Sequence, residues 1–216
     1  MPRTVIRYPL SMLLPKSFYN RPTLQVAQDL LGCLLVRKTP SLLPPLVKGG
    51  WGDFNRIGGL LKYKIVETEA YVGPNDLASH ASRGRTERNG VMFGEPGIIY
   101  VYFTYGMHYM LNIVTERKGY PAAVLIRAVE PINGEDAPRR VSTNGPAKLT
   151  KALKIDKTFN HLPIYTKKHG LWIVGANGRS PLQIVKTTRI GVDYAGKYKN
   201  KKWRFYVKDN KFISKK

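Results

Sequence analysis

Residues 97–112 read Gly-Ile-Ile-Tyr-Val-Tyr-Phe-Thr-Tyr-Gly-Met-His-Tyr-Met-Leu-Asn, a run rich in aromatic and β-branched side chains. Such side chains favour strands, and the glycine-containing link at residues 104–107 separates one run, 98–103, from a second, 108–114. Short links of this kind join the antiparallel strands of a β-hairpin. The stretch therefore predicts a hairpin whose tip carries Tyr105.

The rest of the chain adds strands and helices around this hairpin. Apolar stripes predict one helix that begins at Pro22 or Thr23 and ends before Gly32, and a second helix over residues 146–153. Further strands are expected over residues 33–37, 62–68, 122–128 and 204–207. Because the two kinds of element do not alternate strictly, the predicted fold class is α+β.

Length and composition indicate a single domain. The 216 residues, 43% of them hydrophobic, can bury one sizeable core, and the sequence has no internal repeat. Residues 39–60 are rich in proline and glycine and are expected to form an inserted surface loop. The lone Cys33 is expected to be a small buried side chain. No apolar run approaches the roughly 18 residues of a membrane span, so no membrane partner is expected.

The charge balance indicates a polyanionic partner. Lysine and arginine number 36 against 14 acids, a net charge of +22, and such an excess binds phosphates by releasing their counterions. Residues 196–216 carry eight of the lysines. That segment is either a solvated basic tail or a phosphate-contacting one, and its composition fits both.

Two acids stand out against this basic background. Glu67 and Glu69 lie two positions apart on an expected strand, which directs them to one face at a separation of about 7 Å. That separation falls between the two ranges typical of glycoside-hydrolysing carboxylate pairs. Pairing with nearby Lys62 and Lys64 is the alternative. If burial raises its pKa, an acid here could act as a general base toward water.

Tyrosines gather near these acids. Aromatic rings combined with positive charge are used to stack on nucleobases, and the tyrosines concerned are Tyr71, Tyr100, Tyr102, Tyr105 and Tyr109. Core packing is the simpler explanation for Tyr100 and Tyr109. Tyr105, at a turn, suggests a wedge that enters a base stack. No metal site is predicted, because His80, His108, His161 and His169 are scattered without ligand spacing.

These segments resemble the alkyladenine (3-methyladenine) DNA glycosylases. The similarity runs over residues 13–213, broken by residues 39–60, and rests on Glu-Thr-Glu-Ala-Tyr-Val-Gly-Pro, Met-Phe-Gly-Glu-Pro-Gly, Tyr-Val-Tyr-Phe-Thr-Tyr-Gly-Met-His-Tyr, Leu-Ile-Arg-Ala-Val-Glu-Pro and Gly-Pro-Ala-Lys-Leu-Thr-Lys-Ala-Leu. The resemblance implies a compact single α+β domain, spanning residues 1–216, with a curved, mainly antiparallel sheet and a protruding hairpin that enters DNA.

The resemblance also implies an activity. Family members flip alkylated or deaminated purines (3-methyladenine, 7-methylguanine, hypoxanthine, ethenoadenine) out of duplex DNA. They then hydrolyse the N-glycosidic bond with an activated water and leave an abasic site. It further implies no cofactor or metal, a monomer, and damaged double-stranded DNA as the partner. The expected location is cytoplasmic and nucleoid-associated in a prokaryote, or the nucleus or an organelle in a eukaryote.

Catalytic roles follow from the resemblance residue by residue. Glu69 matches the general base that deprotonates the water. Arg127 matches a residue that helps to hold this water and the nearby phosphate. Ile190 lies in a segment, with Gly191, that resembles the loop whose backbone carbonyl contacts the water.

The resemblance assigns the base-binding residues in the same way. Tyr71 and Tyr102 match aromatics that sandwich the flipped base, and His80 matches the residue that hydrogen-bonds its edge. Asn112 matches a side chain that crowds the exocyclic amino group of normal guanine. Tyr105 matches the hairpin-tip residue that fills the space left by the flipped base.

Two other functions use the same residues differently. A non-catalytic module that binds nucleic acid, such as RNA, would use the positive charge and the aromatic side chains but would not need Glu69. A sugar hydrolase acting through Glu67 and Glu69 would not need a net charge of +22. An assay for abasic sites in duplex DNA with a single damaged purine separates these functions from a DNA glycosylase.

Overall fold

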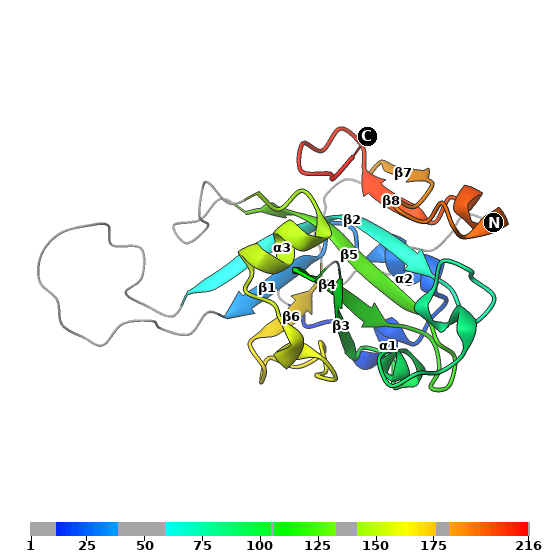
Figure 1. The fold of residues 1–216 in the computed structure, drawn as a ribbon. Helices are drawn as coiled ribbons and strands as arrows, with labels where there is room; N and C mark the ends of the chain where they lie inside the picture. The colour runs from blue at the N-terminus through cyan, green and yellow to red at the C-terminus, as the bar shows by residue number, and fades with distance from the viewer. Residues whose placement is uncertain (1–11, 39–58, 105, 133–141, 176–181, 216) are drawn as a thin grey trace, which may run out of the picture.

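The predicted hairpin forms one edge of an antiparallel sheet. The computed structural model describes residues 12–38, 59–104, 106–132, 142–175 and 182–215. Within these ranges a single sheet contains eight strands, six of them in the order β3-β4-β5-β2-β1-β6 (Figure 1). In that order the bounds are Ile99–Thr104, His108–Val114, Ala123–Pro131, Leu60–Tyr71, Leu34–Lys38 and Leu171–Val174. β7 (Ile184–Thr187) pairs with β8 (Arg204–Val207), and β8 pairs with β2.

Short helices accompany this sheet. The α-helices are α1 (Lys16–Tyr19), α2 (Thr23–Asp29) and α3 (Pro146–Ala152), and the 3₁₀ helices are η1 (His80–Arg83), η2 (Gly90–Phe93), η3 (Lys157–Phe159) and η4 (Gly196–Asn200). Helices and a curled antiparallel sheet in one compact unit confirm the α+β class.

The sequence predicted most helices and strands, but the bounds of several differ in the structure. The β4 and β8 predictions are confirmed, whereas β2 extends beyond the expected residues 62–68 and β5 beyond 122–128. α2 ends at Asp29, and the chain then turns through Gly32, whose φ of 86° suits glycine. β6, β7 and the 3₁₀ helices were not predicted. Of the expected loop at 39–60, residues 39–58 lie outside the described ranges.

The main core lies between the sheet and the helices α2 and α3. Its buried side chains come from strands β1 to β6 and from both helices, and include Val26, Ile126 and Leu149. Cys33 belongs to this core, which confirms its expected burial. No helix within the described ranges is long and apolar enough to cross a membrane.

Two irregularities in the pairing of β2 with β5 decide which residues face away from this core. Ile65 pairs with Val129, Glu67 with Ala128 and Thr68 with Ile126. The pairing therefore skips Val66 on β2 and Arg127 on β5, as in β-bulges, which re-aim side chains and are common beside active sites. As a result Ile65 joins the main core, whereas Glu67 and Glu69 contact Arg127.

Candidate active site

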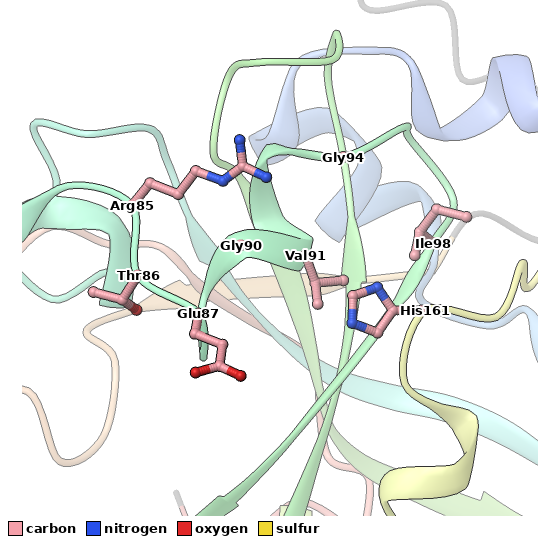
Figure 2. Close-up of a pocket in the computed structure, with 8 residues that line it drawn as sticks. All are labelled: Arg85, Thr86, Glu87, Gly90, Val91, Gly94, Ile98 and His161. Atoms are coloured by element: carbon pink, nitrogen blue, oxygen red, sulfur yellow. The ribbon is translucent and has the colours of Figure 1, made fainter.

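One hollow, of about 530 Å³, lies beside η2 (Figure 2). Its ionisable lining residues, Arg85, Glu87 and His161, are exposed, and none of the predicted site residues lines it. Solvent and salt screen exposed charges, so these residues contribute little to the electrostatics of a site. The candidate site therefore lies elsewhere, although this hollow is larger than the second one.

A second hollow, of about 350 Å³, brings the predicted residues together. Alternate side chains of β3 and β4 line it, joined by residues of β5, η1 and the segment after β7. The predicted residues in its lining are Tyr71, His80, Tyr102, Asn112, Arg127 and Ile190. Tyr105 lies outside the described residues. Residues that are distant in the sequence thus form one pocket, which we name the base pocket after the role that the family resemblance predicts for it.

The hairpin register decides which tyrosines face this pocket. Tyr102 pairs with Met110 and Tyr100 with Asn112, and all four side chains line the pocket. Tyr109 lies on the opposite face, where it packs against the main core. The core packing that the sequence favoured for Tyr109 is therefore confirmed. Tyr100 is both buried and pocket-lining.

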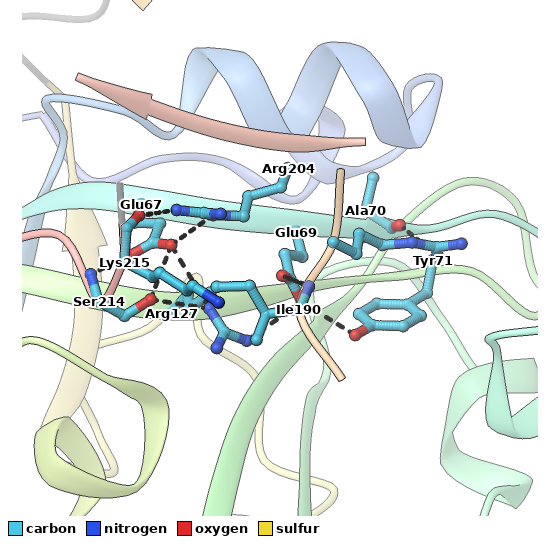
Figure 3. A network of polar contacts seen from close by, with 10 residues as sticks. Glu67, Glu69, Ala70, Tyr71, Arg127, Ile190, Arg204, Ser214 and Lys215 are labelled. Atoms are coloured by element: carbon cyan, nitrogen blue, oxygen red, sulfur yellow. Dashed lines mark hydrogen bonds and ion pairs between the residues drawn. The ribbon is translucent and has the colours of Figure 1, made fainter. Parts of the chain in front are cut away.

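Glu69 is fully buried beside the pocket (Figure 3). Its Oε1 accepts a hydrogen bond from the Ile190 N–H at 2.9 Å, and its Oε2 accepts from the Tyr71 hydroxyl at 3.0 Å and from Arg127 Nη1 at 3.3 Å. A carboxylate offers about four acceptor positions. Among the described residues, donors occupy three of these positions, and the fourth, on Oε1, has no described donor.

Burial dominates the protonation of Glu69. Loss of solvent raises the pKa of its carboxyl, and the nearby Arg127 charge and the hydrogen bonds from Ile190 and Tyr71 oppose this effect. A raised pKa makes the carboxylate a stronger base than an exposed glutamate. The pKa of Tyr71 is raised well above its ordinary value, mainly by burial, so its hydroxyl keeps its proton at neutral pH.

The acids do not pair with lysines as the alternative interpretation supposed. Glu67 accepts a hydrogen bond from Arg204 Nε at 2.7 Å, whereas Lys64 contacts Glu130 at 2.5 Å. The ion-pair partners of Glu67 and Glu69 are arginines from other strands, the buried Arg204 and the partly buried Arg127. These arginines are 137 and 58 residues away in the sequence, so local spacing does not indicate them.

His80 begins η1 with its ring in the pocket wall. Its Nδ1 lies 3.0 Å from the Tyr100 hydroxyl, and its ring packs edge-on against Tyr102 with centroids 4.4 Å apart. Burial, and secondarily the charge of Arg88, lower the pKa of the imidazole. His80 is therefore neutral at neutral pH. Its ring can donate one hydrogen bond and accept another without carrying a positive charge.

A buried ion pair that sequence reasoning missed supports the pocket from behind. Arg189 Nη2 donates to Asp76 at 2.8 Å, both side chains are fully buried, and the guanidinium lies 4.8 Å from the Tyr71 ring centre. Asp76 also accepts the backbone N–H of Ala78, which fixes the segment leading to His80. Asp76 was a visible signal, because it is a third acid in the same short stretch of a basic chain.

The pocket mouth carries a further missed residue. Tyr194 lines the pocket and is 72% exposed, and its hydroxyl lies 3.4 Å from the Ala78 carbonyl. Phe103 and Met107 of the hairpin are also exposed. Apolar side chains thus stand on the hairpin and at the pocket rim.

No metal centre accompanies the pocket within the described ranges. No group of three or more His, Cys, Asp or Glu side chains there could hold a metal ion. The chemistry of the described pocket residues is therefore that of a buried carboxylate, an arginine, hydroxyls and an imidazole.

Comparison with known proteins identifies the family. A family model described as methylpurine-DNA glycosylase matches residues 54–211. A relative from Methanocella arvoryzae is 45% identical over 94% of this chain and 96% of its own length. One from Carboxydothermus hydrogenoformans is 48% identical over 95% and 100%, and one from Legionella pneumophila strain Corby is 43% identical over 94% and 98%. All three carry the provisional name 3-methyladenine DNA glycosylase. The chain therefore belongs to the methylpurine-DNA glycosylase family, whose members hydrolyse N-glycosyl bonds.

Proposed function

We propose that this protein excises alkylated and deaminated purines from duplex DNA, among them 3-methyladenine, 7-methylguanine, hypoxanthine and ethenoadenine. The observation that carries the proposal is a fully buried glutamate, Glu69, with one acceptor position left beside an aromatic pocket of about 350 Å³. A pocket of that size suits a small planar ligand. A purine inside a duplex can enter it only if its nucleotide is flipped out of the stack.

The aromatic residues would hold the flipped base. Tyr71 and Tyr102 line the pocket, and stacking on such rings is worth about 1–3 kcal/mol per base. Lesions with a positive charge, such as 7-methylguanine, gain a cation–π attraction to these rings. The neutral imidazole of His80 adds a hydrogen bond to the base edge. Damaged bases also cost less to unstack and unpair, which favours them over normal ones.

Hydrolysis would then use a water held against Glu69. The water oxygen bonds to the sugar C1′ while Glu69 takes its proton, and the electrons of the C1′–N bond leave with the purine. Arg127 holds Glu69 through Nη1, and no described residue accepts a hydrogen bond from its Nη2, which can therefore face the water or a phosphate. The Ile190 N–H fixes one oxygen of Glu69, and the family resemblance predicts that the backbone carbonyl of this loop contacts the water.

The remaining surface suits a duplex. The net charge of +22 neutralises phosphates, and the exposed Phe103 and Met107 flank the hairpin tip, where Tyr105 would fill the space left by the base. One chain supplies the whole base pocket, so a monomer suffices. With relatives from bacteria and an archaeon, we place the protein in the cytoplasm, in contact with the nucleoid.

The two alternative functions fit the contacts less well. A pure binding module has no use for a buried carboxylate with a raised pKa. A sugar hydrolase would need Glu67 as its second carboxylate, yet the donors that surround Glu67, which are Arg204 and Ser214, do not line the base pocket. The proposed DNA glycosylase mechanism needs only one carboxylate, the general base, and Glu69 can supply it.

The purified protein is expected to convert duplexes with one hypoxanthine or one ethenoadenine into duplexes with one abasic site. Hot alkali then cuts the labelled strand at that position, and gel electrophoresis measures the product. Without alkali the strand should stay intact, because water and not a lysine is the nucleophile. Undamaged duplex is the control. Absence of cleavage after alkali on every lesion would refute the proposed activity.

The acidic limb of the plot of excision rate against pH should reflect the ionisation of Glu69. Since only the carboxylate can accept the proton of the water, excision should rise with pH through the pKa of Glu69. Burial raises that pKa above 4.5, so the limb should lie above pH 4.5. Single-turnover excision of 7-methylguanine, which needs no protonation to leave, measures this limb alone. A rate independent of pH between about 4.5 and 7 would contradict the assignment.

A further inference from the structure

We propose that the C-terminal clasp, residues 212–215, positions Arg127 for the reaction through Ser214 and buried Glu67 (Figure 3). This inference rests on the proposed function. It assigns positioning roles to Ser214 and Glu67, which do not line the base pocket.

The clasp is anchored at several points. After β8 the chain turns, and the Phe212 N–H donates to the Asn210 side chain, which itself bonds Glu130 of β5 at 3.0 Å. Ile213 is buried. The Ser214 N–H then donates to Glu67 Oε2 at 2.6 Å. The clasp is therefore a fixed part of the fold at this site.

Ser214 links Glu67 to Arg127 in a fixed order. Its hydroxyl has one proton to donate and lone pairs to accept. Arg127 Nε can only donate, and it reaches Ser214 Oγ at 3.0 Å, so the Ser214 proton goes to Glu67 Oε1 at 2.9 Å. The chain of donors runs from Arg127 through Ser214 to Glu67.

Glu67 is a buried anchor for this chain. It is fully buried and accepts from Arg204 Nε as well as from Ser214, and Arg204 Nη2 donates to the Lys215 carbonyl. Glu67 and Glu69 balance the charges of Arg127 and Arg204 in the cluster. An anchor with so many donors has little freedom to move.

The hydrogen bond from Arg127 Nε to Ser214 matters because Arg127 could take up another position without it. Arg127 meets Glu69 through a single N–H at 3.3 Å, a longer contact than the 3.0 Å from its Nε to Ser214. An arginine and a carboxylate prefer a two-pronged pair. Without the Ser214 hydroxyl, Nε would keep only its longer contact of 3.4 Å with Glu67 Oε1. Arg127 could then rotate into such a pair with Glu69, cover the acceptor position left for water, and weaken the base.

Other groups also act on Glu69, and the experiment must hold them constant. They are Arg127 of β5, Tyr71 and Glu67 of β2, Tyr102 of β3 and the Ile190 N–H. Substitution of Ser214 changes none of these groups chemically. Any shift in the titration of Glu69 then arises from how Arg127 is placed.

The test compares Ser214→Thr with Ser214→Val in the full-length protein. The two side chains have nearly the same shape, but only threonine keeps the hydroxyl. We expect single-turnover excision of 7-methylguanine to fall roughly 10-fold or more in Ser214→Val and to stay near wild type in Ser214→Thr. The acidic limb of Ser214→Val should move to lower pH by about one unit, because a closer cation favours the ionised carboxyl.

The outcomes separate this inference from the proposed function. Wild-type activity with its acidic limb supports the function whatever Ser214 does. Equal rates in the two variants, or a slower Ser214→Val with an unmoved limb, would overturn the positioning role. Ser214→Ala repeats the comparison with a smaller side chain, and thermal melting identifies any variant that fails to fold.

Discussion

Replacing Glu69 by glutamine should reduce excision by about 10²–10⁴-fold, the usual contribution of a general base. Glutamine has nearly the same shape and can still accept the Ile190 N–H, but it cannot take a proton from water. The carboxylate lies beside Arg127 in a chain of net charge +22, so its loss should leave binding of lesion-containing DNA unchanged or stronger. Single-turnover excision and gel-shift titration measure the two effects separately.

A matched control exists away from the base pocket and the clasp. Glu95 contacts Lys16 and Lys118 and does not line the base pocket. Glu95→Gln also removes one acid, and it should change excision by less than about twofold, as expected of a group outside the site. Near wild-type excision by Glu69→Gln, with Glu95→Gln equally active, would show that Glu69 is not the base.

The local part of this site could be predicted because strands alternate. Period-two patterning gave the bounds of β4, and the hairpin link fixed which strand pairs with β3. The same register puts Tyr109 on the face opposite Tyr102, which pairs with Met110, in agreement with the core packing expected for Tyr109.

The charged cluster could not be predicted from local pattern. Arg204 and Ser214 bond Glu67 from 137 and 147 residues away, and no periodicity links such distant positions. The irregular pairing at Val66 and Arg127 depends on how two strands meet and not on the sequence of either. Only the resemblance to a known family connected Glu69 with Arg127 in advance.

Hydrogen-bond partners distinguish the two glutamates, which spacing alone cannot do. Both glutamates are fully buried, and both accept three hydrogen bonds from described residues. The donors to Glu69, which are Tyr71, Arg127 and Ile190, line the base pocket, whereas the donors to Glu67, which are Arg204 and Ser214, do not. The different roles proposed for the two glutamates come from their hydrogen-bond partners, which only the tertiary structure provides.

Selectivity against normal guanine should depend on Asn112. Guanine differs from hypoxanthine by one exocyclic amino group, so a side chain placed where that group falls would reject guanine alone. Asn112 is buried in the pocket lining, and its Nδ2 donates to the carbonyls of Tyr100 at 3.2 Å and Met110 at 3.3 Å. Two hydrogen bonds to backbone hold the amide in place, so it cannot swing aside for a larger base.

Asn112→Ser should therefore release normal guanine that the wild-type protein leaves in place. Serine removes the amide and opens space, and relief of such a clash is worth about 1–3 kcal/mol, or roughly 10- to 200-fold in rate. The gain should be largest in G·T mispairs, where flipping costs least. Counting abasic sites in duplexes with a single G·T or G·C pair measures it. Asn160→Ser is a matched control, because Asn160 accepts the Val101 N–H and does not line the base pocket. If Asn112→Ser excises hypoxanthine at the normal rate yet releases no more guanine than wild type, the discrimination must come from His80, the pocket backbone or the cost of flipping.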